Sequence, residues 1–215
     1  MNFEEKKNQW TKLFKNSFYN NLNCVNQLSY PNLLDNIWQR GTGFELIFEN
    51  LLMCKENNFN IIETGTCRSG KWSDGASSIL FTEFVKIFNG SVQSVDIKKK
   101  SVIEAKKLIN SDQFTVHHSD SLKFLKNLKD KDKVDLFYLD SYDVVWDNDH
   151  NSAAHHLEEF KLIEPFLKNC LVAIDDNTKF LKSGKRTGKG RLIYEYLIQK
   201  NVYPIYDNYI ILYRF

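Results

Sequence analysis

The sequence lacks several features that would place it in a specialised class of protein. Its 215 residues contain no run of about 18 apolar residues, so no membrane-spanning helix is expected. The first ten residues, MNFEEKKNQW, are polar and lack the apolar core of a secretion signal. The four cysteines lie far apart and form no C-x-x-C pair, which argues against a zinc knuckle and a disulfide framework. We therefore expect a reduced, soluble, cytoplasmic protein.

A strong charge of either sign is also missing. The formal net charge is +2, which is too near neutral for charge alone to predict nucleic-acid binding. What is present is a hydrophobic fraction of 42%, which is too high for a disordered chain. The length suits one domain of ordinary size, with room for a small appendage.

The first 58 residues differ in pattern from the rest. Apolar residues recur there at helical spacing, in two groups: Trp10, Leu13, Phe14 and Phe18, then Phe44, Ile47, Phe48, Leu51 and Leu52. Both stripes are typical of core packing, and a cap over a binding site is the alternative. We predict an N-terminal helical cap or substrate region over 1–58 and a main domain over 59–215.

From residue 59, short apolar runs alternate with helical stretches. Strands are expected at 59–64, 91–97, 114–119, 134–140 and 170–176, and a hairpin around Asp207-Asn208 closes the chain. Such alternation predicts a parallel sheet with helices on both faces. The predicted fold class is α/β: a Rossmann-like, doubly wound, mostly parallel seven-stranded sheet with an antiparallel C-terminal edge hairpin.

Carboxylates stand at or just after the ends of these strands. Ligands of such folds bind at the carboxyl ends of the strands, so the acidic set is a candidate site: Glu63, Asp96, Asp120, Asp140, Asp175 and Asp176. Any one of them could serve turn chemistry alone. Six together favour convergence on one site.

The loop after the first strand, ETGTCRSGKW (63–72), is compatible with more than one nucleotide chemistry. Gly65 and Gly70 with Lys71 nearly match a P-loop, but Trp72 stands where a magnesium-binding Ser or Thr is needed. Asp96 is placed to accept hydrogen bonds from a ribose diol. Asp120, between two serines, could meet an adenine edge. A cofactor with an amino acid, a sulfonium cation and an adenosine fits this row.

Residues 59–215 resemble class I S-adenosylmethionine (SAM)-dependent methyltransferases. The matching segments are ETGTCRSG (63–70), SVDI (94–97), HSDSLKFL (118–125), FYLDSYD (137–143) and LVAIDDN (171–177). The chain is most similar to small-molecule O-methyltransferases of the catechol and macrolide-sugar type. The resemblance implies that Glu63 and the glycine loop hold the methionine part, Asp96 the ribose and Asp120 the adenine. The full expected cofactor set is Glu63, Gly65, Thr66, Ser69, Gly70, Asp96, Ile97, Ser119, Asp120, Ser121 and Asp140.

Three of the carboxylates form a candidate metal site. Asp140, Asp175 and Asp176 end neighbouring strands of the predicted sheet, and such hard oxygen donors suit Mg²⁺ or another divalent cation. The resemblance implies the same role, with Asn177 as an alternative ligand. The opposing interpretation is a strand-end turn and helix cap.

The proton acceptor is open among three residues. A metal would lower the pKa of an acceptor hydroxyl, and the oxyanion would attack the methyl carbon. Catechol-type enzymes have a lysine three residues after the first aspartate, where this chain has Asp143. His155 and His156 are the other candidates. Neighbours on a helix point about 100° apart, so at most one histidine is expected to face the site.

The segment 179–191 is basic and rich in glycine, which predicts either a lid for an anionic acceptor or a solvated loop. It lacks interleaved aromatic residues, so a nucleic-acid partner is not expected. The predicted function is metal-dependent O-methylation of a small hydroxylated acceptor by SAM. The alternatives are a P-loop nucleotide hydrolase and a methyltransferase-like module that binds without turnover. A homodimer is left open.

Overall fold

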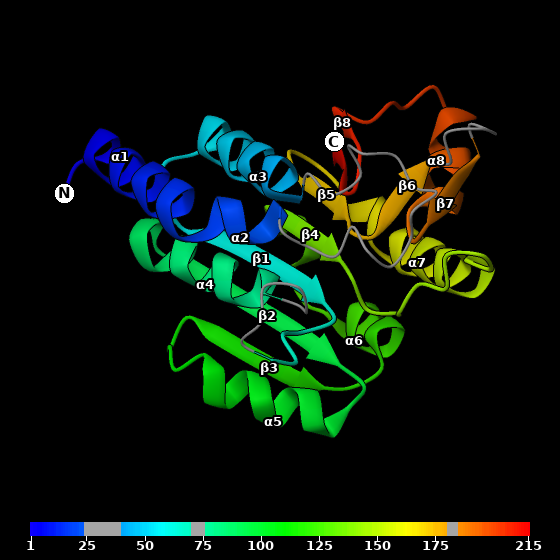
Figure 1. Cartoon of the computed structure of the whole chain (residues 1–215), viewed down its shortest axis with the longest axis horizontal. Helices are drawn as coiled ribbons and strands as arrows, with labels where there is room; N and C mark the ends of the chain where they lie inside the picture. The colour runs from blue at the N-terminus through cyan, green and yellow to red at the C-terminus, as the bar shows by residue number, and fades with distance from the viewer. Residues whose placement is uncertain (24–39, 70–75, 180–184) are drawn as a thin grey trace.

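The computed structural model describes residues 1–23, 40–69, 76–179 and 185–215, and a seven-stranded sheet lies at its centre (Figure 1). The strands stand in the order β3-β2-β1-β4-β5-β9-β8. Their bounds are β1 (Phe59–Thr64), β2 (Gly90–Asp96), β3 (Phe114–His118), β4 (Leu136–Leu139), β5 (Leu171–Ile174), β8 (Tyr206–Asp207) and β9 (Ile211–Arg214). Strands β1 to β5 pair in parallel, and β9 pairs antiparallel with β5 and β8. The predicted sheet and its C-terminal hairpin are confirmed.

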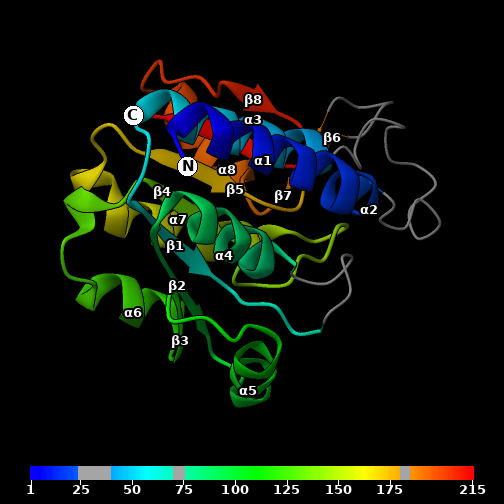
Figure 2. The ribbon, with the colours of Figure 1, turned by 90° about the vertical axis from the view of Figure 1, so that its left-hand side faces the viewer.

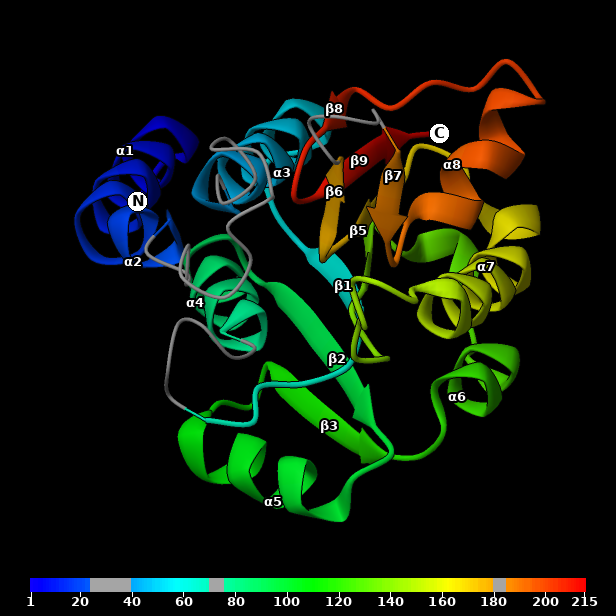
Figure 3. The same ribbon diagram turned by 45° about the vertical axis from the view of Figure 1, so that its right-hand side comes forward.

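Helices cover both faces of this sheet, as Figure 2 and Figure 3 show. One face packs against α1 (Phe3–Leu13), α3 (Arg40–Cys54), α4 (Ser77–Phe88) and α5 (Lys99–Leu108). The other face packs against α6 (Ser121–Asn127), α7 (His150–Ile163) and α8 (Arg191–Ile198). A π-helical segment (Phe14–Tyr19), α2 (Asn20–Asn23) and two short 3₁₀ turns (Lys131–Lys133 and Glu164–Phe166) complete the helical elements. The doubly wound arrangement is therefore confirmed.

The central strands show why two helical layers are needed. Along β4, Leu136 and Tyr138 enter one core, whereas Phe137 and Leu139 enter the other. All four side chains are buried, because successive residues of a strand point to opposite faces. A strand that is apolar at every position must be covered on both sides.

The N-terminal helices belong to the first of these cores. Trp10 of α1 is 3% exposed. The centroid of its ring lies 4.7 Å from the ring centroid of Phe48 on α3 and 5.2 Å from that of Phe84 on α4. Both expected apolar stripes thus pack as core. The division of the chain at residue 58 stays a prediction. Across the described part of the chain, no helix combines the length and apolar character needed to cross a bilayer.

A two-stranded ribbon, β6 (Asn177–Lys179) and β7 (Arg186–Gly188), was not expected from the sequence. It lies within and just before the basic segment 179–191, of which residues 180–184 fall outside the described residues. Figure 3 shows the ribbon beside the ends of β5 and β9. The described residues of the basic segment thus lie in this ribbon, in the short turn after it and at the start of α8 (Arg191–Ile198), and the choice between a lid and a solvated loop stays a prediction.

The packing of Trp10 yields a prediction for the role of α1. Trp10→Ala should lower the free energy of unfolding by about 3–5 kcal/mol, because a large buried ring leaves a cavity. Chemical denaturation should show this loss, and Thr11→Ala, at an exposed position, is the matched control. A loss no larger than that of the control would mean that α1 is not part of the core.

Candidate functional site

The carboxyl ends of β1, β2, β3, β4 and β5 meet at one edge of the sheet. Parallel register sets this: Thr64 pairs with Val95 and with Leu139, and Leu139 pairs with Ile174. The predicted carboxylates at these ends are therefore gathered at one edge. Apart from Glu63 on β1, they divide into two groups, one near β2 and β3 and one near β4 and β5.

The first group lines a cavity of about 210 Å³. Four residues expected to bind cofactor share its wall: Asp96, Ile97, Asp120 and Ser121. Asp96 Oδ1 accepts a hydrogen bond from the Lys98 amide at 2.6 Å. Burial raises the pKa of Asp96. The opposite wall comes from residues after β4 and from α7, namely Ser141, Tyr142 and His155.

Asp120 has a second, structural role. Its Oδ1 accepts a hydrogen bond from the Lys123 amide at 3.0 Å and caps the start of α6. This helix cap was not predicted for Asp120, and the same side chain still borders the cavity. Ser119 differs from its neighbours, because it lines another cavity described below.

The glycine loop after β1 is tied to the adjacent strands. The Gly65 amide donates to the Val95 carbonyl at 2.8 Å, and Ser94 Oγ donates to the Gly65 carbonyl at 2.6 Å. Gly65 has φ of +86°, and a Cβ there would lie 2.5 Å from the Asp140 carbonyl oxygen. A side chain at this position is excluded on both grounds. The loop backbone consequently lies against the end of β4.

Glu63 is buried beneath this loop, at 1% exposure. Ser77 Oγ donates to its Oε1 at 2.6 Å, and Ser78 Oγ donates to its Oε2. Burial nevertheless raises the pKa of Glu63 from 4.5 to about 7. In this arrangement the Glu63 side chain holds the start of α4 through these hydrogen bonds. Its contact with a cofactor stays a prediction.

Of the remaining loop residues expected to bind cofactor, the structure describes Thr66 and Ser69. Thr66 is buried, with its hydroxyl 3.4 Å from that of Ser78. Ser69 is half-buried. Gly70, with the Lys71 and Trp72 of the P-loop alternative, lies outside the described residues.

The second group of carboxylates is paired with two buried cations that the sequence analysis did not single out. Arg40, the first residue of α3, donates from Nη2 to Asp175 Oδ2. Lys189 Nζ contacts Asp140 Oδ1 and lies 2.7 Å from Asp176 Oδ2. Both cations are at most 5% exposed. We name Arg40, Asp140, Asp175, Asp176 and Lys189 the ion cluster.

The ion cluster gives its three carboxyl groups different proton affinities. Burial and the neighbouring Asp175 and Asp176 raise the pKa of Asp140 to about 7, against the opposing effect of Lys189. Burial also raises the pKa of Asp175. Burial acts in the same sense on Asp176, but Lys189 and the Tyr209 hydroxyl outweigh it and lower its pKa to about 2.

The expected three-carboxylate magnesium site does not fit this arrangement. Two of the three carboxylates face Lys189 Nζ, and the third faces Arg40. Asp175 Oδ1 is buried without a hydrogen-bond partner among the described residues, but Lys189 Nζ contacts the facing oxygens of Asp140 and Asp176, and its positive charge would repel a dication there. Within the ranges the structure describes, no group of three or more His, Cys, Asp or Glu side chains is arranged to hold a metal ion.

Asn177, the alternative ligand, is committed to the backbone. Its Nδ2 donates to the Ile174 carbonyl at 2.8 Å, and its Oδ1 accepts from the Gly190 amide at 2.7 Å. Asn177 thus holds the Lys189 segment against the end of β5.

The three candidate proton acceptors occupy different environments. Asp143 is exposed and pairs with Arg68 at 2.8 Å and Lys98 at 3.4 Å. Partial burial acts to raise its pKa, but these cations outweigh it and lower the pKa. His156 is fully buried, and burial lowers its pKa to about 4. Neither environment favours a base at neutral pH.

His155 is the candidate that borders the cavity. Its Nε2 lies 2.9 Å from Ser121 Oγ and 3.3 Å from Glu159 Oε1. Burial acts to lower its pKa, but Glu159 outweighs burial and raises it. Because His155 sits beside Asp120 and Ser121, it is placed on the side of the cavity expected to hold adenine. The expectation that only one of the two histidines faces the site is consistent with these positions.

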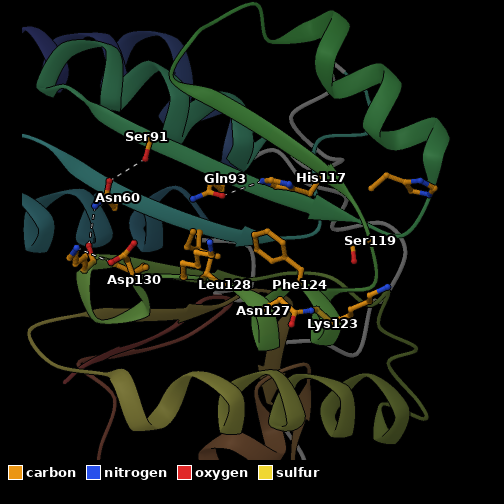
Figure 4. Close-up of a pocket in the computed structure, with 15 residues that line it drawn as sticks. Asn60, Ser91, Gln93, His117, Ser119, Lys123, Phe124, Asn127, Leu128 and Asp130 are labelled. Atoms are coloured by element: carbon orange, nitrogen blue, oxygen red, sulfur yellow. Dashed lines mark hydrogen bonds and ion pairs between the residues drawn. The ribbon is translucent and has the colours of Figure 1, made fainter.

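A larger cavity, of about 720 Å³, is lined by residues of β1, β2, β3 and α6 and reaches the carboxyl end of β3 at Ser119 (Figure 4). Gln93 and His117 project into it from the sheet, and Phe124 faces them from α6. His117 Nε2 and Gln93 Oε1 are 3.2 Å apart. Size alone does not assign the cavity a function, because none of the six strand-end carboxylates lines it.

Comparison with known proteins identifies the fold. No protein-family model matches the sequence, and a sequence search of curated proteins found no significant match. The human methyltransferase 10 domain containing protein is 11% identical with a TM-score of 0.54, over 100% of this chain and 98% of that one. An rRNA methylase from Streptococcus thermophilus is 10% identical with a TM-score of 0.51, over 80% and 95%.

A third similar structure is MycE, a methyltransferase of the mycinamycin biosynthetic pathway solved with Mg and S-adenosylhomocysteine (SAH). It is 15% identical with a TM-score of 0.52, and the match covers 86% of this chain and 51% of MycE. The chain thus spans about half the length of MycE. At these identities the likenesses show a shared Rossmann-like methyltransferase fold.

The buried Glu63 gives stability a specific pH dependence. Because the native state holds this proton more tightly than the unfolded chain, the protonated group stabilises the fold below pH 4.5. That contribution, about 3 kcal/mol, should be lost as pH rises to about 7. Urea denaturation from pH 4.5 to 8 should show wild type losing this stability relative to Glu63→Gln, which cannot titrate. Exposed Glu56→Gln is the control; parallel profiles for wild type and Glu63→Gln would contradict the prediction.

Proposed function

We propose that this chain is a SAM-dependent methyltransferase. The observation that carries the proposal is the strand-end cavity, whose wall unites Asp96, Ile97, Asp120 and Ser121 from two separate strand ends. A carboxylate after β2 and a polar turn after β3 are the groups expected to meet a ribose diol and an adenine edge. The chain shares its fold with methyltransferases to which its sequence is only 10–15% identical. This shared fold supports the same class of cofactor.

The orientation of the cofactor follows from this placement. With the nucleoside between Asp96 and His155, the methionine part extends toward Gly65, whose backbone lies against Asp140. The sulfonium methyl group would then face the ion cluster. In this proposal His155 contacts the nucleoside and does not accept the acceptor's proton.

We further propose a small hydroxylated acceptor. The ion cluster holds three carboxylates against two cations and lies beside this cavity at the same sheet edge. Because its cations are paired with carboxylates, the cluster offers no excess of positive charge to the phosphate backbone of a nucleic acid and suits a neutral, hydroxyl-bearing molecule. Among the similar structures, MycE has been solved with mycinamycin VI, whereas the bacterial neighbour is named an rRNA methylase. An assay that detects methyl transfer to RNA and none to small hydroxylated molecules would refute this choice of acceptor.

Asp96 provides the sharpest test of cofactor binding. Asp96→Ala should weaken SAH binding about 10- to 100-fold, because a carboxylate that accepts charge-assisted hydrogen bonds from the ribose is lost. Isothermal titration calorimetry measures the change. Asp112→Ala, at an exposed position before β3, removes the same functional group elsewhere and should leave the affinity unchanged. Equal affinity for both variants would mean that the ribose does not lie at Asp96.

Thermal unfolding separates the proposal from the P-loop alternative. Saturating SAH should raise the melting temperature by several degrees, since a ligand at 100 times its Kd contributes about 2.7 kcal/mol. ATP with Mg²⁺ should give no such rise. Stabilisation by ATP with Mg²⁺ and none by SAH would overturn the proposal. Binding of SAH without transfer to any acceptor would favour the non-catalytic module.

A further inference from the structure

The ion cluster is built so that a lysine is held between two carboxylates. Gly188 and Gly190 flank Lys189 and press its backbone onto the chain after β5. Gly188 has φ of +113°, and a Cβ there would clash with the Asp176 carbonyl. A Cβ at Gly190 would lie 2.7 Å from Asn177 Oδ1. At Gly188 only glycine fits, because the φ is positive and the clash is with backbone, whereas a side chain at Gly190 would displace the Asn177 side chain.

Three hydrogen bonds hold this short segment in place. The Lys189 amide donates to the Asp176 carbonyl at 3.1 Å, and the Gly190 amide donates to Asn177 Oδ1 at 2.7 Å. The Gly188 amide donates to Asp149 Oδ2 at 2.8 Å, on the side of α7. The side chain of Lys189, 2% exposed, therefore points into the cluster from a fixed backbone.

The position of Nζ is the one that a bridging cation would take. Nζ contacts one oxygen of Asp140, at the end of β4, and one oxygen of Asp176, at the end of β5. Arg40, at the start of α3, adds a second positive charge through its ion pair with Asp175. A dication beside Nζ would meet strong repulsion in this buried setting.

We infer that Lys189 Nζ replaces the divalent cation in this site. The ammonium group pairs with the carboxylates that would otherwise bind a metal ion. The methyl acceptor is therefore bound and methylated without a metal ion. This assignment of Lys189 concerns the same site as the proposed function and rests on that function for the identity of the reaction. The two carboxylates that Nζ joins, Asp140 and Asp176, remain when the lysine charge is removed, so a divalent cation with retained waters should then bind between them.

The experiment is Mn²⁺ binding, measured by electron paramagnetic resonance and by thermal unfolding. Wild type should bind no Mn²⁺ throughout the millimolar range. Lys189→Met keeps the length of the stem, removes the charge and should gain at least about tenfold in Mn²⁺ affinity. Its melting temperature should fall in EDTA and recover with Mn²⁺. Adding Asp140→Asn to this variant should abolish the gain.

Two control variants separate the cluster from general surface charge. Lys185→Met, at an exposed position four residues earlier, should bind no Mn²⁺, and Lys189→Arg, which keeps the charge, should bind none either. Mn²⁺ binding by wild type as tight as that by Lys189→Met would overturn the inference. So would a Lys189→Met protein that gains no affinity, or one that fails to fold and is not rescued by Mn²⁺.

SAH calorimetry on the same preparations tests the proposed function separately. If the protein does not bind SAH but the Lys189 variants bind Mn²⁺ as expected, the proposed function is refuted and the lysine assignment stands. A chain that binds SAH and whose wild-type form also binds Mn²⁺ tightly would leave the function standing and refute the lysine assignment.

Discussion

The crowding of three carboxylates at adjacent strand ends, with Asp175 buried and Asp140 and Asp176 half-buried, is the constraint on which the rest of this site depends. Asp140, Asp175 and Asp176 follow strands whose register places them side by side. Charges withdrawn from water are costly unless they are paired. Arg40 and Lys189 supply the pairing, and each must be delivered from outside the central strands. The need to pair these negative charges thus places the segments that carry Arg40 and Lys189 against the ends of β4 and β5.

The compensation joins distant parts of the chain. Arg40 opens α3, whose Phe44 and Phe48 lie in the core beneath the sheet, while Lys189 lies between the β6–β7 ribbon and α8. Both segments therefore converge on the ends of β4 and β5. Helix α3 does more than cover apolar surface, since its first residue, Arg40, reaches the polar edge of the sheet.

The nucleoside side of the edge is organised differently. Asp96 and Asp120 border a cavity and are satisfied in part by backbone amides, which suits side chains that must also meet a ligand. The contrast gives the sheet edge two functions: a pocket that can accept hydrogen-bond donors, and an internally neutralised cluster at the reacting end. Gly65 lies between the two, with its backbone against Asp140.

By itself, the sequence determined the order of strands and helices, the two-sided sheet and the gathering of acidic residues at one edge. It could do so because apolar periodicity is local and parallel register is common to the fold. Only the tertiary structure decided which partners those carboxylates meet. Arg40 lies 100 residues before Asp140, and Lys189 stands in a basic stretch that resembles a solvated loop. Ion pairing depends on distance in space, so spacing along the chain predicted a metal where the fold placed a lysine.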